Sequence, residues 1–230
     1  MSLERLKQEL QAKANPEKAK ISQGFFKTGK GEYGEGDIFL GLTSEEIKSI
    51  AKEYRELDLS EVEKMLNSKI HEYRMTALRI LLLKYKKDRE NIYNFYLKNT
   101  RNINNWDLVD VTCPHIVGNY LIDKNKGILY KLAKSENLWE KRIAIVSTFE
   151  FIRYKEFDDT LKIGEILLND KHDLIHKAVG WMFREIGKKD VKVLETFLKK
   201  HYKKMPRTML RYSIEKFNKE KRDAYLKGVI

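Results

Sequence analysis

A similar helical pattern returns about every 34 residues along most of this chain. The segments 71–78 and 139–146 resemble each other and lie 68 residues apart, and the segment 105–110 lies halfway between them. Further copies follow at 173–180 and 207–214. A period near 34 is typical of antiparallel helix pairs stacked into a solenoid, because each pair buries its apolar face against its neighbours.

Apolar periodicity also predicts helices from Thr43 onward. Two runs have the i, i+3, i+4, i+7 spacing of a core-facing helix, namely Leu78, Leu81, Leu82 and Tyr85, and Val179, Met182, Phe183 and Ile186. The segment 60–63 has the form of a capping box at a helix start. Only 12 Gly and 3 Pro occur, too few for the frequent turns of an all-β chain. Since the tetratricopeptide consensus is absent, we predict an all-α protein, a curved α-α superhelix of HEAT-like repeats whose shape suits duplex DNA.

Glycines interrupt this pattern between residues 22 and 42. We expect an ordered loop there, joining N-terminal helices within 1–42 to a repeat array over 43–230, all in one domain spanning 1–230. Residues 24–30 nearly match a phosphate-binding P-loop, and residues 29–34 fit the G-x-G-x-x-G fingerprint. No strand precedes either motif, and Gly31 stands where a P-loop needs a Ser or Thr hydroxyl. Nucleotide binding is therefore disfavoured, and a contact between loop amides and a backbone phosphate is more plausible.

The charge balance favours a polyanionic partner. The chain has 46 Lys and Arg against 34 Asp and Glu, a net charge of +12. A positive surface collects phosphates and releases their counterions, although a merely lysine-rich surface has the same composition. One Cys excludes an internal disulfide framework, and no apolar run approaches a membrane span. With no secretion signal at the N-terminus, we expect a cytoplasmic protein.

The helix around Trp181 has a second face of interest. Lys177, Trp181 and Arg184 share the face opposite its core stripe, at i, i+4 and i+7. A Trp flanked by two cations is unusual in solvent. Two alternatives are open: the face is expected either to pack against a neighbouring repeat or to form an aromatic platform in a phosphate-binding groove.

A Trp and an Asp four residues apart mark the segment 104–113. The helical pattern places Trp106, Asp110 and Cys113 on one side, and Leu108, Val111 and Thr112 on the other. Asp110 can lie beside the Trp106 ring, or it forms a structural ion pair. Asp107 is expected to cap or pair structurally, and Cys113 to serve packing. Pro114 is expected to end or kink the helix.

Arg142 is harder to orient, because its segment is apolar nearly all round. Arg142 and Arg153 are eleven residues apart and would align on one helix, which fits a groove edge or two buried ion pairs. His172 and His176 have the i, i+4 spacing of a metal-binding pair, but no third ligand lies near. We therefore predict no metal and no cofactor.

At these residues the chain resembles the HEAT-like-repeat alkylpurine DNA glycosylases, the AlkD-like DNA alkylation-repair proteins. The resemblance covers essentially the whole chain and is densest at 106–110, 138–145 and 177–185. It implies a curved stack of helix pairs with double-stranded DNA in a basic concave groove. It also implies base-excision repair by hydrolysis of the N-glycosidic bond of cationic N3- and N7-alkylated purines, such as 3-methyladenine and 7-methylguanine.

The resemblance also implies roles for individual residues. The family's catalytic Asp corresponds to Asp110, and its two lesion-facing indoles correspond to Trp106 and Trp181. Its DNA-backbone contacts fall on Arg142 and Arg184, and Lys177 is a further candidate. The aromatic residue of the family's N-terminal helices corresponds to Phe25 or Phe26 in this chain. Family members can have a Tyr at that position, so this chain is not expected to make a contact there that depends on a hydroxyl.

The residues agree with the chemistry that the resemblance implies. A carboxylate at Asp110 would stabilise the sugar cation and position the attacking water. Two indoles would favour a cationic nucleotide by about 1–2 kcal/mol each. No Lys is singled out for a Schiff base, so we expect a monofunctional enzyme, acting as a monomer. The alternatives are a non-catalytic HEAT-repeat protein that binds damaged or branched DNA, and a protein–protein scaffold.

Overall fold

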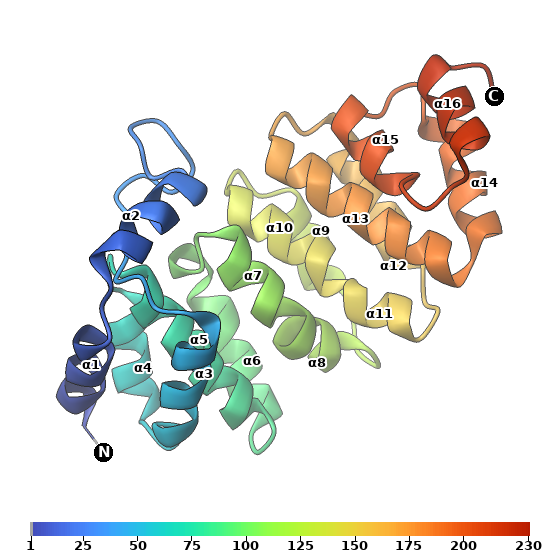
Figure 1. The fold of residues 1–230 in the computed structure, drawn as a ribbon. Coiled ribbons are helices and arrows are strands. Elements are labelled where there is room, and N and C mark those ends of the chain that lie inside the picture. The colour runs from blue at the N-terminus through green and yellow to red at the C-terminus, as the bar shows by residue number, and fades with distance from the viewer. Residues whose placement is uncertain (1) are drawn as a thin grey trace. The chain divides into compact units, whose positions relative to one another are not determined.

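The computed structural model describes residues 2–230, which form α-helices joined by turns and loops (Figure 1). They fall into two compact units, the first ending at Thr112 and the second beginning at Cys113. No β-strand forms within the described residues, so the predicted all-α class is confirmed. No helix among them is both long and apolar enough to cross a membrane.

The helices of each unit follow one another closely in sequence. The first unit contains α1 (Leu3–Ala12), α2 (Pro16–Phe25), α3 (Ser44–Glu53), α4 (Leu59–Leu66), α5 (His71–Tyr85), α6 (Arg89–Lys98), the short 3-10 turn η1 (Thr100–Asn102) and α7 (Trp106–Cys113). The second contains the π-helical turn η2 (Pro114–Gly118), α8 (Asn119–Leu121), α9 (Gly127–Ala133), α10 (Leu138–Ser147), α11 (Phe149–Arg153), α12 (Asp158–Ile166), the 3-10 turn η3 (Leu167–Asn169), α13 (Asp173–Lys189), α14 (Val191–His201), α15 (Arg207–Ser213) and α16 (Lys219–Lys227).

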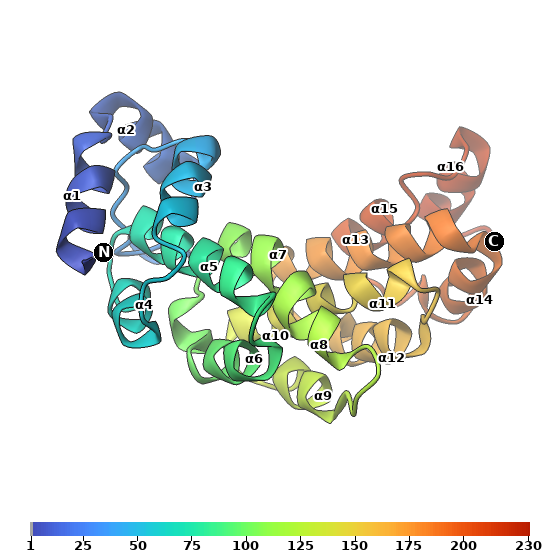
Figure 2. The same ribbon diagram turned by 90° about the horizontal axis from the view of Figure 1, so that it is seen from below.

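Each copy of the 34-residue repeat begins at or next to the start of a helix. The five sequence copies coincide with the beginnings of α5, α7, α10, α13 and α15. In the first unit α5 packs against α3, α4 and α6, and in the second α13 packs against α10, α14 and α15 (Figures 1 and 2). Each central helix is thus covered by its neighbours, as expected for stacked helical repeats.

The core stripes agree with the periodicity, with one exception. The predicted stripe of α13 is fully buried. In α5 the corresponding stripe is buried except for Leu82, which is half-exposed. The whole first half of α5, residues 71–78, is buried on every face, including its charged side chains. The pattern of one helix does not reveal this burial, because three other helices enclose α5.

Local capping differs from the predicted box at residues 60–63. Helix α4 begins two residues earlier than this box predicts, because the extended backbone of Asp58, and not Ser60, takes the N-cap position. Ser60 therefore lies inside the helix and its hydroxyl cannot cap it. A complete capping box occurs instead at α3, where the Thr43 side chain accepts from the Glu46 amide and the Glu46 carboxylate accepts from the Thr43 amide.

One predicted helix alignment is wrong, and the burial of α7 does not follow its two predicted sides. Cys113 is fully buried, whereas Val111, assigned to the opposite side, is half-exposed. The reason is that the last turn of α7 leads directly into the buried η2 turn at Pro114, which ends the α-helix as predicted. Arg142 and Arg153 lie on separate helices, α10 and α11, which meet at Thr148. Arg142 is buried and Arg153 is exposed, so the two do not form one edge.

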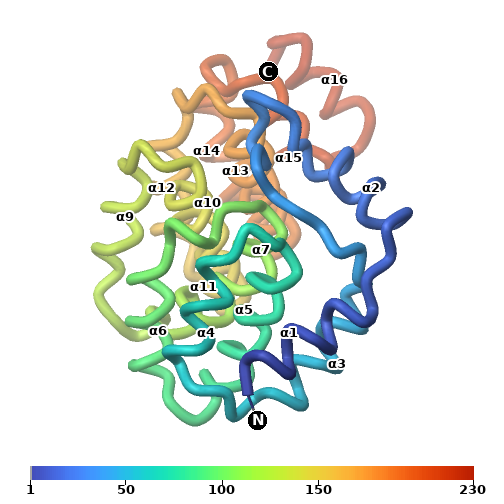
Figure 3. Tube along the Cα trace, turned by 90° about the vertical axis from the view of Figure 1, so that its left-hand side faces the viewer, coloured from blue at the N-terminus to red at the C-terminus, as the bar shows by residue number. Residues whose placement is uncertain are grey.

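The glycine-rich loop after α2, drawn as a blue tube in Figure 3, is hydrogen-bonded to the start of α5. The Ile38 carbonyl accepts a hydrogen bond from the His71 amide, and the Ile38 amide donates one to the Lys69 carbonyl. The Glu72 carboxylate accepts from the amides of Leu40 and Gly41, at 2.9 and 2.7 Å. Gly41 has φ +84°, and any Cβ there would meet the α2 backbone. The loop is therefore ordered by backbone contacts, as predicted, and no strand adjoins its two nucleotide-like motifs within residues 2–230.

Candidate catalytic site and nucleic-acid interface

Helix α7 presents Trp106 and Asp110 on one half-open face. The helix begins at Trp106, whose amide donates to the side chain of the buried Asn105 at 2.8 Å. Asp110 follows one turn later, and both side chains are half-buried. As predicted, this indole and this carboxylate lie one turn apart on the same side of the helix.

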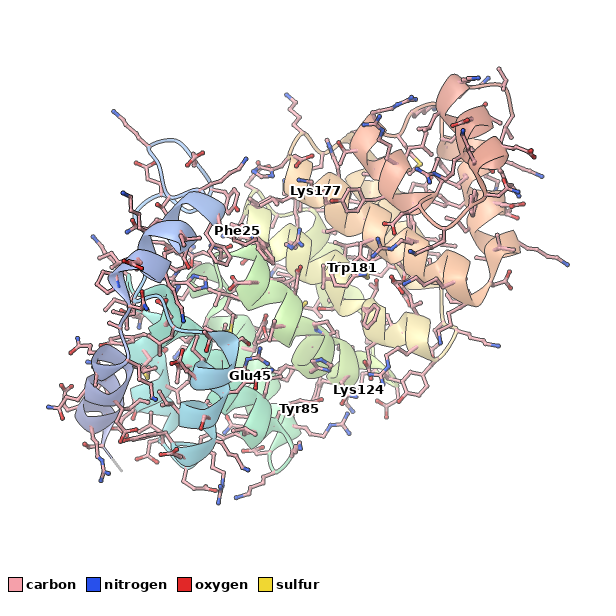
Figure 4. All side chains as sticks on the ribbon, in the orientation of Figure 1. Phe25, Glu45, Tyr85, Lys124, Lys177 and Trp181 are labelled. Carbon is pink, nitrogen blue, oxygen red and sulfur yellow. The ribbon has the colours of Figure 1, made fainter. Side chains whose placement is uncertain are left out.

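Aromatic side chains hold the Trp106 ring from the loop side. Phe26 stacks on it, with centroids 5.3 Å apart and planes inclined by 26°, and Phe25 meets it edge-on at 5.8 Å. The indole Nε1–H donates to the Tyr33 hydroxyl at 3.3 Å. Phe25 is 64% exposed at the end of α2 (Figure 4). Phe25 and Phe26, which the resemblance singled out, thus both contact Trp106, whereas Tyr33, which no pattern in the sequence indicated, supplies a hydroxyl to the same indole.

A buried cluster of charged groups lies behind this aromatic layer. The His71 Nε2 lies 2.8 Å from Asp107 Oδ2, and its Nδ1 lies 3.5 Å from Asp37 Oδ2. Arg74 binds the same Asp37 oxygen at 2.6 Å. Burial opposes ionisation of Asp37, but His71 and Arg74 outweigh it and lower the pKa of that carboxyl. Asp107 thus pairs structurally, as predicted.

A cavity of about 250 Å³ opens beside this cluster, between α2, α3, α5 and α7. Its lining includes Phe26, His71, Arg79, Asp107 and Val111. The Nε of Arg79 is buried without a hydrogen-bond partner in the described structure, and burial lowers the pKa of its guanidinium. The cavity brings solvent close to the His71–Asp107 pair.

In the second unit, α13 carries the other predicted indole. Trp181 is half-buried and tilted against Phe149 of α11, with centroids 5.8 Å apart. Lys177 lies one turn before Trp181 on the same helix (Figure 4) and forms an ion pair with Asp173 at 2.6 Å. Arg184 pairs with Glu215 of the α15–α16 segment. Because these ion pairs are partly exposed, a phosphate group could replace their carboxylates at low cost.

Arg142 has a structural role that the resemblance did not imply. Its buried guanidinium donates through Nη1 to the Leu174 carbonyl at 2.6 Å, which ties α10 to the first turn of α13. The two histidines of that turn serve the helix start. His172 Nδ1 accepts from the Leu174 amide, and His176 Nε2 lies 2.6 Å from the Asp170 carbonyl oxygen. Within residues 2–230 no group of three or more His, Cys, Asp and Glu side chains could hold a metal ion.

Comparison with known proteins decides the family. The family described as DNA alkylation repair enzyme matches residues 6–217. The chain belongs to the DNA alkylation repair enzyme family. A solved structure described as a predicted DNA alkylation repair enzyme from Enterococcus faecalis shares the fold, with a TM-score of 0.73 and 18% identity over 90% of this chain and 97% of that chain. Among curated proteins, none matches the chain.

For a DNA alkylation repair enzyme, the distribution of charge is informative. Residues 188–230 contain fourteen Lys and Arg against five Asp and Glu, and so carry nine of the twelve net positive charges. Four lysines at the end of α14 and in the loop after it are exposed, namely Lys199, Lys200, Lys203 and Lys204. A basic segment of this density attracts nucleic acid through counterion release.

Replacing Tyr33 by Phe should loosen Trp106 without unfolding this alkylation repair enzyme. The variant removes the acceptor of the indole N–H, a bond worth about 0.5–1.5 kcal/mol. We expect faster solvent exchange of the Trp106 indole proton in NMR spectra. The exposed Tyr154 provides a matched control as Tyr154→Phe. Unchanged exchange in Tyr33→Phe would show that the hydroxyl does not hold the ring.

Proposed function

We propose that the chain is a monofunctional DNA glycosylase that hydrolyses the N-glycosidic bond of cationic N3- and N7-alkylated purines in double-stranded DNA. The observation that carries this proposal is the half-open face of α7, where Asp110 and Trp106 lie one turn apart. Membership of the DNA alkylation repair enzyme family supports a role in the repair of alkylated DNA. We further propose that the enzyme acts as a monomer in the cytoplasm, on nucleoid DNA.

The proposed chemistry needs one carboxylate and one water molecule. Alkylation at N3 or N7 makes the purine a cation, so the base leaves as a neutral molecule when the bond to C1′ breaks. Positive charge then moves onto the deoxyribose. The Asp110 carboxylate stabilises that charge and orients the water, which adds to C1′ and loses a proton. The products are the free base and an abasic site.

The indoles select for positive charge. The electron-rich face of Trp106, held in place by its aromatic neighbours, attracts the cationic nucleotide. We propose that Trp181 contacts the same nucleotide, and that Lys177 and Arg184 contact the phosphates. Phosphate contacts position the enzyme without reading sequence.

Base release from methylated DNA tests the proposal. Purified protein should release 7-methylguanine and 3-methyladenine from methylated duplex DNA, and the abasic strand should remain uncut until alkali is added. Tight binding to this DNA without release of either base would refute the glycosylase and favour the non-catalytic DNA-binding alternative. Weak binding that does not depend on salt would favour the scaffold.

The basic segment makes a separate prediction about DNA affinity. Changing Lys199, Lys200, Lys203 and Lys204 to Gln should weaken DNA binding and flatten its salt dependence. The slope of log K against log salt concentration should fall by about 0.9 for each phosphate that the variant no longer neutralises. Fluorescence anisotropy with a labelled duplex measures both quantities.

A matched control removes the same charge elsewhere. Lys48, Lys52, Lys64 and Lys69 are exposed in the first unit, and their change to Gln should alter the slope less. Equal slopes for the two quadruple variants would mean that net charge alone, and not the C-terminal segment, governs binding.

A further inference from the structure

We propose that His71, which has no role in the proposed reaction, is a positioning residue for Trp106, and that its imidazolium form holds the first turn of α7 in place. The inference rests on the proposed function for its effect on base release. Its structural part, the control of Trp106 by His71, stands on the geometry of the first unit alone.

The first observation is a cluster of four rings. Phe39 stacks on His71 with centroids 4.6 Å apart and planes inclined by 21°. His71 lies against Phe26 at 5.1 Å and 31°, and Phe26 stacks on Trp106 at 5.3 Å and 26°. Phe26 also stacks on Phe39, with centroids 5.1 Å apart and planes inclined by 12°, so Phe26, Phe39 and His71 contact one another and reach Trp106 through Phe26. Because Phe26 contacts both His71 and Trp106, a displacement of the His71 ring can reach Trp106 through one intervening ring.

The second observation is a hydrogen bond to the residue after Trp106. His71 Nε2–H donates to Asp107 Oδ2 at 2.8 Å, and Asp107 Oδ1 accepts from the Leu108 amide at 2.8 Å. Asp107 lies in the first turn of α7, so His71 holds that turn both through the ring cluster and through this carboxylate. The bond joins residues 36 apart in the sequence.

The charges around His71 favour its protonated form. Asp107 faces Nε2 from α7, Asp37 faces Nδ1 from the glycine-rich loop at 3.5 Å, and Arg74 of α5 binds Asp37 from its other side. Among residues 2–230, Nδ1 has no hydrogen-bond partner, so Asp37 favours the cation through its charge, whereas Nε2–H also donates a hydrogen bond to Asp107. Burial disfavours the cation, but the two carboxylates outweigh burial and the repulsion by Arg74, and the pKa of His71 is raised.

The direction of the pH effect follows from this shift. A folded-state pKa above the unfolded one stabilises the fold fully below the unfolded value, and the stabilisation is lost as pH rises through the folded value. Deprotonation leaves Asp107 and Asp37 without their shared cation. Trp106 should therefore be held firmly at lower pH and loosen as pH rises through the pKa of His71.

An NMR titration of the indole N–H signals in the intact protein tests this without any substrate. Three Trp residues give three signals, and Trp139 and Trp181 lie in the second unit as internal controls. We expect the Trp106 signal alone to shift with pH, with the same midpoint as the His71 ring signals. A Trp106 signal that stays constant while His71 titrates would overturn the proposal.

Two variants sharpen the titration. His71→Gln should abolish the pH-dependent shift of the Trp106 signal. Asp37→Asn removes one of the two carboxylates and leaves the Asp107 bond intact, so the midpoint should move to lower pH. The second variant keeps the test valid if the first does not fold. A shift of Trp106 that persists unchanged in either folded variant would assign the titration to another group.

The effect on chemistry is measured separately. If the proposed function is right, single-turnover base release by His71→Gln should be about tenfold slower than that of the native protein, with little change in DNA affinity. The native rate constant should fall as pH rises through the His71 midpoint. Absence of base release in the native protein would defeat the glycosylase proposal and leave the NMR result standing, so the two failures are distinguishable.

Discussion

The Asp110→Asn variant is expected to release 7-methylguanine from methylated duplex DNA about 10²–10³-fold more slowly than the native protein. Asn keeps the size of the side chain but removes the negative charge that faces the developing sugar cation. Loss of one well-placed electrostatic group commonly costs this much in rate. Single-turnover assays with excess enzyme measure the effect on the chemical step.

The DNA affinity of Asp110→Asn should not fall with its rate of base release. Removing a negative charge near phosphates should leave the affinity unchanged or raise it slightly. Asp123→Asn makes the same chemical change at an exposed position and should leave base release unaltered. If Asp110→Asn released base at the native rate, Asp110 would not be the catalytic group and the proposed mechanism would fail.

Gly180→Ala should destabilise the second unit by about 3 kcal/mol. Gly180 lies on α13 where α15 crosses it. A Cβ added there would lie 2.5 Å from Tyr212 Cβ and 2.6 Å from the Met209 carbonyl oxygen. Neither atom is the end of a flexible side chain, so the helices must separate. Urea unfolding followed by circular dichroism should show the loss of stability as a lower midpoint.

The same substitution at Gly24 is the matched control. Gly24 lies in helix α2, and a Cβ there meets nothing within 4 Å. Gly24→Ala should therefore leave stability unchanged or raise it by about 0.5–1 kcal/mol, since Ala is the better helix former. Equal midpoints for the two variants would show that α13 and α15 are not in such close contact at Gly180.

The helix starts were predictable because they depend on local periodicity. The copies at 71–78, 105–110, 139–146, 173–180 and 207–214 coincide with α5, α7, α10, α13 and α15. The amphipathic stripe of α13 is likewise a property of one stretch of sequence, since residues at i, i+3 and i+4 share a helix face in any setting. Trp106 and Asp110 could be paired on one face of α7 for the same reason.

The errors arose where a neighbour decides the outcome. The segment around Thr148 is apolar nearly all round, so its pattern gave no sign that α10 ends and α11 begins there. The pattern around Arg142 fits a groove residue, yet its guanidinium is buried against the Leu174 carbonyl, 32 residues away. Burial of this kind depends on which helix lies alongside, and periodicity within one helix does not specify that.

The candidate site shows the same division. Sequence pattern and resemblance together were enough to single out the indole and the carboxylate of α7, because these residues belong to one helical turn. The groups that hold the indole came from the folded chain. Tyr33 reaches Trp106 across 73 residues, and His71 reaches Asp107 across 36. These partners depend on how α2, α5, α7 and the glycine-rich loop pack into one unit. Only this tertiary packing brings the His71 imidazole between two carboxylates and against the aromatic rings.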